Sequence, residues 1–524
     1  MGANIVGYTG KLPATALCGE PATAIAPTMS QLELFPALDP ATSPKRRGAR
    51  AKAATAGRKT AAQARPRNAR AGAPEAGSQQ AARKRPSSRP AAKSETKRGA
   101  KTGKKIAAKP RAQARTQTQP PAQPQAQTTA EAGPSALPPY ETIALVLQGG
   151  GALGAYQAGV FQGLSEAGII PNRLSGISIG ALNTAIIAGN APEKRIEKLV
   201  EFWETICRPN LGAAPYPFIE QSLFNLSDSV RQGMSALHAL GAVVDGQNGF
   251  FRPRFPPPTF VLASEPDQVS YYDTSPLRDT LLRLCDFDRI NSGEMHVSVG
   301  AVNVRTGNFK YFDNTHDTLR PEHFMASGAL PPAFPAVEID GEYYWDGGMV
   351  SNTPLANILN TRPRTDTLVF QVDLWSARGR LPVNMGEVTD RMKDVQYSSR
   401  TRLITEHLRW TQHLRHMLRN VLQNVPPEVR QNDLYCKLAE QLSSSKRYNV
   451  LHLIYRDQPY DQHYKDYQFG LPTMRQRWAA GLQDIRETLS RPGFLDMPDN
   501  DSGFITHDVH RDEIERAMLD DSVG

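Results

Sequence analysis

One stretch, residues 142–183, constrains the fold of this chain more than any other, because its pattern is that of a single βαβ unit. Thr142–Leu147 is a short apolar run with β-branched residues and is followed by glycines, which predicts a buried strand. A helical apolar pattern follows and stops at Gly168, and a second strand then runs into residues 176–180. Successive strands joined by a helix lie parallel and are often adjacent. We therefore expect the turns after both strands to share one edge of a sheet.

Both turns carry residues suited to acyl transfer. Residues 176–180 are GISIG, a G-x-S-x-G motif placed between the strand and a helical segment at 181–188. In that setting the motif predicts a sharp elbow that exposes the hydroxyl of Ser178, with glycines on both sides making room. The other turn contains the glycine run 149–151, followed by Gly154. Backbone N–H groups of this loop are expected to face the carbonyl that Ser178 attacks.

A third motif, in the segment GEYYWDGGMVSNTPL, places Asp346 after an aromatic strand and before Gly347 and Gly348. The two glycines allow the backbone to turn sharply beneath a fixed carboxylate. A D-G-G sequence by itself is a common turn. Its functional interpretation here depends on the two motifs that precede it.

With these three motifs in this order, the chain resembles the patatin-like phospholipases over residues 140–375. That family combines a Gly-rich oxyanion loop, a G-x-S-x-G elbow and a D-G-A/G turn in one α/β domain. The resemblance implies Ser178 as the nucleophile and Asp346 as the general base of a Ser–Asp dyad. It assigns the oxyanion donors to the first loop, foremost to the amides of Gly150 and Gly151. The glycines that it places in the loop, the elbow and the turn are Gly149, Gly150, Gly151, Gly154, Gly176, Gly180, Gly347 and Gly348.

The resemblance also implies a fold and a reaction. The fold is a three-layer α/β arrangement with a largely parallel sheet, and the reaction is that of a serine lipid acyl hydrolase, a carboxylic ester hydrolase. Neither a metal ion nor an organic cofactor is implied. The family often has Arg or Lys before the last glycine of the first motif, where this chain has Leu153. A cation that would help with anionic head groups is missing there, so phospholipid, neutral lipid and storage polyester all stay open as substrates.

Three other interpretations are left open. Residues 149–154 fit a dinucleotide-binding fingerprint, but the acidic residue expected at the end of the second strand is replaced by Ser178. An α/β-hydrolase triad needs a histidine, and seven lie beyond Asp346, although the 29 residues from Gly149 to Ser178 leave no room for intervening strands. A carboxylate base should keep activity below the usual imidazole pKa of about 6.5, which would distinguish the dyad from the triad. A catalytically silent scaffold that binds a surface or nucleic acid is the third.

Charge divides the chain at residue 138. Residues 1–138 hold 24 Lys and Arg against 6 Asp and Glu, whereas the remainder holds 37 against 46. The first segment has two aromatic residues and no apolar periodicity, so we predict a disordered tail and linker. Its positive charge predicts adhesion to a polyanion, which leaves an anionic membrane, a granule surface and nucleic acid open.

The remainder is predicted to form an α/β domain at 139–380 and a mainly helical extension at 381–524, which begins with a long helix from Met385. Residues 210–258 have no regular pattern, and two interpretations are a lid or acyl-chain wall and an ordinary surface insertion. The other predicted elements are strands at 259–263, 295–304, 367–374 and 451–454 and helices at 192–207, 276–284 and 474–489.

The cysteines at 18, 207, 285 and 436 show no C-x-x-C spacing, which predicts reduced thiols and a cytoplasmic protein. The sequence has no apolar run of 18 or more residues, so we expect no bilayer span and only peripheral contact with a membrane. The histidines at 407, 413 and 416 lack carboxylates at ligand spacing, and we interpret them as helix surface rather than a metal site. The oligomeric state is not indicated.

Overall fold

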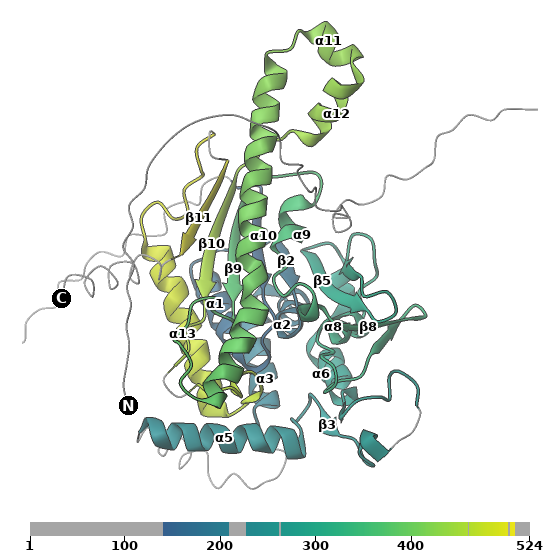
Figure 1. The fold of residues 1–524 in the computed structure, drawn as a ribbon, viewed down its shortest axis with the longest axis vertical. Coiled ribbons are helices and arrows are strands. Elements are labelled where there is room, and N and C mark those ends of the chain that lie inside the picture. The colour runs from purple at the N-terminus through teal and green to yellow at the C-terminus, as the bar shows by residue number, and fades with distance from the viewer. Residues whose placement is uncertain (1–139, 209–226, 261–263, 459–460, 501–502, 509–524) are drawn as a thin grey trace, which may run out of the picture. The chain divides into compact units, whose positions relative to one another are not determined.

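The computed structural model describes residues 140–208, 227–260, 264–458, 461–500 and 503–508 (Figure 1). All of them fall within one compact unit, residues 121–524. The predicted tail and linker at 1–138 and Cys18 lie outside the described residues, so the adhesion of the tail to a polyanion stays a prediction. Cys207 and Cys285 are buried free thiols, and Cys436 is a half-buried one.

Within the described residues, nine strands form one central sheet in the order β11-β10-β9-β1-β2-β5-β8-β7, with β6 beside β5. The pairs from β11 across to β5 are parallel, and β6, β7 and β8 are antiparallel to their neighbours. The predicted α/β class with a largely parallel sheet is confirmed. The strands are β1 (Thr142–Leu147), β2 (Arg173–Gly176), β5 (His296–Asn303), β6 (Phe309–Asp313), β7 (Val337–Ile339), β8 (Glu342–Asp346), β9 (Thr367–Asp373), β10 (Tyr448–Ile454) and β11 (Phe504–Asp508).

The alternation of side chains along β1 explains the three layers. Leu145 and Leu147 enter the larger core, whereas Ala144 and Val146 enter a second cluster on the other face. Helices α1 (Ala155–Glu166), α2 (Ile179–Ala188), α3 (Arg195–Ile206) and α13 (Leu471–Ser490) contribute to the larger core. The second cluster contains residues of α9 (Leu355–Asn360) and α10 (Met385–Gln423), and α10 runs in front of the sheet in Figure 1.

The remaining elements surround these layers. The helices are α5 (Asp228–Asp245), α6 (Ser275–Leu284), α7 (Phe287–Asn291), α8 (Pro321–Ser327), α11 (Pro427–Asn432) and α12 (Leu434–Leu442). A separate two-stranded ribbon consists of β3 (Arg252–Pro253) and β4 (Tyr272–Asp273). Short 3₁₀ turns are η1 (Gly151–Gly154), η2 (Pro192–Lys194), η3 (Pro258–Phe260), η4 (Gly347–Met349) and η5 (Lys465–Tyr467). None of the helices in the described ranges is both long and apolar enough to cross a membrane.

The C-terminal part is joined to the rest through the sheet. Strand β10 pairs in parallel with β9, and β11 pairs in parallel with β10, so the sheet continues across the boundary predicted at residue 380. Helix α13 packs along α1, because glycines on both helices let the backbones approach. A Cβ on Gly159 of α1 would lie 1.9 Å from the carbonyl oxygen of Trp478, and one on Gly481 of α13 would lie 2.0 Å from that of Tyr156.

Most predicted elements of the globular part are present, with one exception. The prediction of a strand at 259–263 is wrong for residues 259 and 260, because residues 258–260 form a 3₁₀ turn. Residues 261–263 lie outside the described residues. Helix α5 was missed in the segment interpreted as irregular. Its signals are a serine N-cap, in which the Ser227 hydroxyl accepts a hydrogen bond from the Val230 amide, and apolar residues at helical spacing. Two glycines of low helix propensity, Gly233 and Gly241, obscured the pattern.

We predict that Gly481→Ala lowers the stability of the protein although alanine favours helix. The new methyl group would collide with backbone on α1, and overpacking of this kind costs about 1–3 kcal/mol. The matched control is Gly233→Ala on α5, where a Cβ meets no atom within 4 Å and a gain of about 0.5–1 kcal/mol is expected. Chemical denaturation of the three proteins measures both effects. Equal stability of Gly481→Ala and wild type would contradict the close packing of the two helices.

Candidate active site

The G-x-S-x-G motif lies between β2 and α2, with Ser178 at the turn. Ser178 has φ 55° and ψ −123°, a conformation that residues with a side chain rarely adopt. The flanking glycines are required by close approach: a Cβ on Gly176 would lie 2.4 Å from the Gly180 oxygen, and one on Gly180 would lie 2.3 Å from the Leu147 oxygen. Tight packing therefore holds the serine in a strained turn at the carboxyl end of β2.

Asp346, the last residue of β8, lies directly against this serine. The Ser178 hydroxyl donates a 2.6 Å hydrogen bond to Oδ2 of Asp346, and the Gly348 amide donates a 2.7 Å bond to Oδ1. The side chain is 3% exposed. Burial raises the pKa of Asp346 to about 7, while the hydrogen bonds from Ser178 and Gly348 act to lower it. The structure thus brings together the serine and the carboxylate that the sequence motifs singled out.

This raised pKa corrects one expectation from the sequence. A carboxylate of ordinary pKa would stay ionised well below the range of imidazole, but a value of about 7 lies close to that of histidine. A pH profile alone therefore cannot distinguish a carboxylate base from a histidine base in this protein. Geometry is more informative, because the described residues that line the cavity around Ser178 include no histidine.

The glycine-rich turn after β1 forms one wall of the cavity next to Ser178. Gly149, Gly150 and Gly151 line the cavity, and Gly151 has φ 56°. The Gly149 amide donates to the Asn352 carbonyl oxygen at 3.4 Å. Within the described part of the chain, no hydrogen bond is formed by the amides of Gly150 and Gly151. Two unpaired donors therefore stand beside the serine, at the start of a 3₁₀ turn that leads into α1.

Four of the predicted glycines lie outside the described lining of the cavity: the elbow glycines Gly176 and Gly180, and also Gly154 and Gly347. A Cβ on Gly154 would lie 2.6 Å from Cγ1 of Ile179, so this glycine allows η1 to pack on α2. A Cβ on Gly347 would lie 2.4 Å from the Gly300 oxygen, so the absence of a side chain at Gly347 allows the turn after β8 to pack on β5. Neither lines the cavity, whereas Gly348 does. The structure therefore gives Gly154 a packing position against Ile179, outside the described lining of the cavity.

The cavity has a volume of about 280 Å³ and mainly apolar walls. Ala242 and Val243 of α5 line it, so the segment at 210–258 supplies part of the wall, which favours the lid or acyl-chain wall over an ordinary surface insertion. Asp346 and Asp466 are the charged residues among the described lining, which contains no Lys or Arg. Five aromatic side chains pack mostly edge to face around the apolar end: Phe250, Phe251, Tyr272, Phe334 and Phe469.

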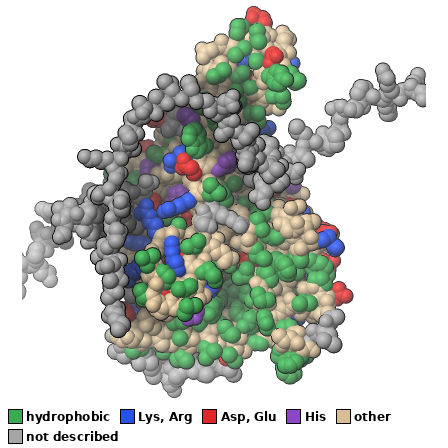
Figure 2. Space-filling model, viewed as in Figure 1, with side chains coloured by type: hydrophobic (Ala, Val, Ile, Leu, Met, Phe, Trp, Pro, Cys, Tyr) green, Lys and Arg blue, Asp and Glu red, His purple; other side chains and the backbone are tan. Residues whose placement is uncertain are grey.

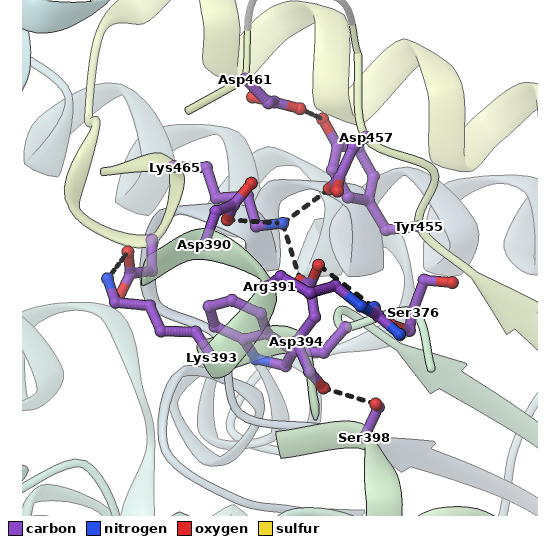
Figure 3. Close-up of polar contacts among 12 residues, drawn as sticks. Ser376, Asp390, Arg391, Lys393, Asp394, Ser398, Tyr455, Asp457, Asp461 and Lys465 are labelled. Atoms are coloured by element: carbon purple, nitrogen blue, oxygen red, sulfur yellow. Dashed lines mark hydrogen bonds and ion pairs between the residues drawn. The ribbon is translucent and has the colours of Figure 1, made fainter. Parts of the chain in front are cut away.

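The segment after β10 also reaches the cavity, and a buried ion-pair network holds it in place (Figure 3). The fully buried Nζ of Lys465 lies 2.8 Å from carboxylate oxygens of Asp394 and Asp457 and 3.1 Å from Asp390. These three carboxylates have the spacing of a cation site, and the Lys465 ammonium occupies the position among them. Burial acts to lower the pKa of Lys465, but the carboxylates raise it well above the ordinary value. The network therefore fixes the residues that follow Lys465 against the cavity.

Sequence reasoning missed several residues of this site. Asn352 follows the D-G-G turn by four residues, and Trp375 follows β9, and both lie beside Gly149. Tyr397 comes from α10, and its pKa is raised to about 12 by burial and by the nearby carboxylates of Asp346 and Asp466. Only the aromatic pair Phe250 and Phe251 gave a signal, because it lay in the segment interpreted as a lid or wall. Asn352 and Trp375 reach the cavity from the turns after β8 and β9, and Tyr397 reaches it from α10 of the C-terminal part.

Two sequence models of protein families match the chain. One, described as patatin-like phospholipase, matches residues 145–359, and one described as patatin phospholipase matches residues 395–501. Among solved structures, the chain is similar to VipD from Legionella pneumophila at 15% identity and a TM-score of 0.30, over 72% of this chain and 74% of that one. It is also similar to a chain of the ExoU–SpcU complex from Pseudomonas aeruginosa at 16% identity and a TM-score of 0.22, over 58% of each chain. Comparison with curated proteins gave no match.

We predict that Asp346→Asn stabilises the protein at alkaline pH. The folded-state pKa of about 7 lies above the ordinary value of 3.8, so the contribution of the carboxyl group to stability is complete below pH 4 and is lost as the pH rises through 7. Each unit of pKa difference is worth about 1.4 kcal/mol, and the amide removes this loss. Asp346→Asn should therefore exceed wild type by a few kcal/mol at pH 8.

Denaturation at pH 4.5 and pH 8 measures this effect. The difference between the two proteins should shrink toward the lower pH. Asp279→Asn, at an exposed position of α6, is the control and should follow wild type at both values. Parallel behaviour of Asp346→Asn and wild type would contradict the raised pKa.

Proposed function

We propose that this chain, which belongs to the patatin-like phospholipase family, hydrolyses lipid esters with Ser178 as nucleophile and Asp346 as general base. The family makes the chain a lipid acyl hydrolase, that is, a carboxylic ester hydrolase. One observation supports the two roles above all: the 2.6 Å hydrogen bond from the Ser178 hydroxyl to a carboxylate that is 3% exposed. The strained elbow keeps this hydroxyl at the cavity wall.

In the first half of the reaction, Ser178 attacks the acyl carbonyl while Asp346 takes its proton. The amides of Gly150 and Gly151 stabilise the negative charge on the carbonyl oxygen. Asp346 then gives the proton to the leaving alcohol, and the acyl group stays on Ser178. In the second half, Asp346 takes a proton from water, the water oxygen attacks the acyl-enzyme, and Ser178 recovers its proton as the fatty acid leaves.

A base with a pKa of about 7 suits both halves. With a pKa of about 7, the ionised form of Asp346 can accept a proton near neutral pH, and the protonated form is acidic enough to return it. An aspartate of ordinary pKa would hold the transferred proton more weakly. Burial of the carboxyl group, and not a neighbouring negative charge, is the main cause of this tuning.

The cavity walls favour recognition of an acyl chain. Aromatic and aliphatic side chains line the described cavity, and no Lys or Arg faces it to pair with a phosphate. Position 153, where the family often has Arg or Lys, supplies no cation to the cavity either, since Leu153 is fully buried in the core and lies outside the cavity lining. Beside the wall, the ribbon of β3 and β4 and its flanks expose apolar side chains: Phe255, Phe260, Val269 and Tyr271. Figure 2 shows hydrophobic side chains gathered over the lower part of the face in view. An ester at a lipid surface fits these features.

The competing functions fare differently. A Ser–His–Asp triad would need a histidine between Ser178 and the acid, and here the acid touches the serine directly. A dinucleotide would need polar partners, and the cavity beside Gly149–Gly151 has apolar walls. A silent scaffold and a storage-polyester hydrolase are distinguished by turnover assays.

We predict that Ser178→Ala and Asp346→Asn each reduce ester hydrolysis by about 10⁴-fold or more, because each removes one half of the proton-transfer pair. Release of p-nitrophenol from a butyrate ester is the measurement. Ser490→Ala, at an exposed serine on the last turn of α13, is the matched control and should keep the wild-type rate.

The same assay tests the triad. Replacing the histidines beyond Asp346 by alanine one at a time should leave most of the rate. The dyad would be abandoned if one such variant, still folded, lost turnover while Asp346→Asn kept a substantial part of it. Unchanged turnover in Ser178→Ala would refute the whole assignment, and turnover of none of the lipid and polyester substrates would favour the scaffold.

We also predict that Ala242→Trp shortens the acyl chain that the enzyme accepts. Ala242 lies in the cavity wall and is 1% exposed, so an indole there would fill space meant for methylene groups. Each methylene excluded from an apolar site costs about 0.8 kcal/mol, or roughly fourfold in kcat/KM. Hydrolysis of a dodecanoate ester should fall far more than that of a butyrate ester. Leu240→Trp, on the same helix but 58% exposed, is the control, and an equal loss for both ester lengths would contradict the acyl-chain assignment.

A further inference from the structure

The carbonyl oxygen of Gly149 is held by two side chains from distant parts of the chain. Asn352 Nδ2 donates to it at 3.0 Å, and Trp375 Nε1 donates to it at 2.8 Å. Both side chains are almost fully buried, Asn352 at 6% exposed and Trp375 at 3%. Two hydrogen bonds to one backbone oxygen, away from solvent, make a strong orientational restraint.

This restraint also determines the direction of the Gly150 amide. A peptide group is planar and trans, so the N–H of Gly150 points opposite to the C=O of Gly149. Gly150 lines the cavity, and its amide has no partner within the described residues. A peptide between two glycines has little intrinsic preference for one orientation, because neither residue has a Cβ to restrict rotation. The anchor on the carbonyl therefore determines which way the amide faces.

The contacts around Trp375 show that the anchor is itself rigid. The Gln148 side chain accepts hydrogen bonds through Oε1 from the amides of Leu374 and Trp375, at 2.6 and 3.1 Å. The ring of Tyr397 lies 5.0 Å from the indole, and Nζ of Lys465 lies 5.3 Å from the indole ring centre. A Cβ on Gly150 would lie 3.2 Å from Trp375 Nε1, so the indole packs directly on the glycine that carries the unpaired amide.

We propose that Asn352 and Trp375 are positioning residues, which hold the Gly149–Gly150 peptide so that the Gly150 amide faces the oxyanion. This proposal rests on the proposed function, since it gives the amide a role in the same reaction. Neither side chain needs to touch the reacting atoms. If both bonds are lost, the peptide can turn over, and its carbonyl oxygen would then meet the developing negative charge.

Trp375→Phe and Asn352→Leu each remove one donor and keep most of the shape. Loss of one oxyanion donor costs about 10²–10³-fold in kcat, and each single variant keeps one of the two restraints, so we expect a fall of about tenfold for each. The double variant should lose more than the product of the two singles, about 10³-fold, because the peptide is then free. KM should change little.

Two further readouts separate positioning from a general structural defect. A trifluoromethyl ketone, whose adduct with the serine carries an oxyanion, should bind more weakly in step with the loss of kcat/KM. The midpoint of the pH profile should stay at the wild-type value, because Ser178 and Asp346 keep their contact. Trp478→Phe is the matched control: it also removes an indole hydrogen bond, to Gln162 Oε1 at 2.6 Å, but between α1 and α13.

The inference is overturned if Trp375→Phe and Asn352→Leu keep kcat and inhibitor affinity within about twofold of Trp478→Phe. It is also overturned if the pH midpoint moves with kcat, since the defect would then lie in the Ser178–Asp346 pair. If Trp375→Phe does not fold, Asn352→Leu carries the same test alone. Ser178→Ala in the same assay keeps the two failures apart, because retained turnover there refutes the proposed function itself.

Discussion

The contact between Ser178 and Asp346 places a carboxyl group where water cannot reach it. Water normally stabilises a carboxylate, and here two hydrogen bonds, from the serine hydroxyl and the Gly348 amide, replace it incompletely. The incomplete replacement appears as a pKa raised to about 7. The incomplete solvation of the carboxylate raises its pKa and so makes it a suitable base, and it also destabilises the folded protein above neutral pH. The fold must therefore supply stability elsewhere, and the sheet and its two cores are where it does so.

The parallel sheet explains how residues so far apart in sequence meet. β1, β2 and β9 are neighbours in the same direction, so the Gly-rich turn, the elbow and Trp375 all follow the carboxyl ends of adjacent strands. Asp346 reaches the same edge from an antiparallel strand, β8, because its pairing with β5 places it opposite Ala301. The C-terminal part then closes the site from the side: α10 brings Tyr397, and the segment after β10 brings Tyr467 and Phe469. Both regions that match a family model thus contribute walls to a single cavity.

Sequence patterns predicted the parts of this site that local constraints determine. The elbow and the Gly-rich turn are recognisable because close backbone contacts allow only glycine at 176 and 180, and those contacts depend on neighbouring residues. Asp346 was identifiable only together with the other two motifs. Trp375, Tyr397 and Phe334 were not predictable, because their positions depend on how strands and helices pack over long range, which leaves no local pattern. The pKa of Asp346 was missed for the same reason: burial is a property of the assembled fold. Gly154 shows that a motif glycine can also serve packing, since it lets η1 approach Ile179 of α2.

The Lys465 network raises the question of why a chain would keep a fully buried ammonium among three carboxylates. Replacing buried ion pairs by apolar groups is often neutral or stabilising, so net stability is a weak reason for keeping them. The orientation of the segment is a better reason, because the hydrogen bonds of a salt bridge depend on angle more strongly than apolar contacts do. Lys465 links α10, through Asp390 and Asp394, to the segment after β10, and the next residue, Asp466, lies with its backbone against Gly151. A Cβ on Gly151 would lie 2.1 Å from the Asp466 oxygen, so a shift of that segment would displace the Gly-rich turn. The segment after β10 thus packs against the Gly-rich turn that carries the unpaired amides. Lys465 fixes that segment to α10 through its ion pairs with Asp390 and Asp394.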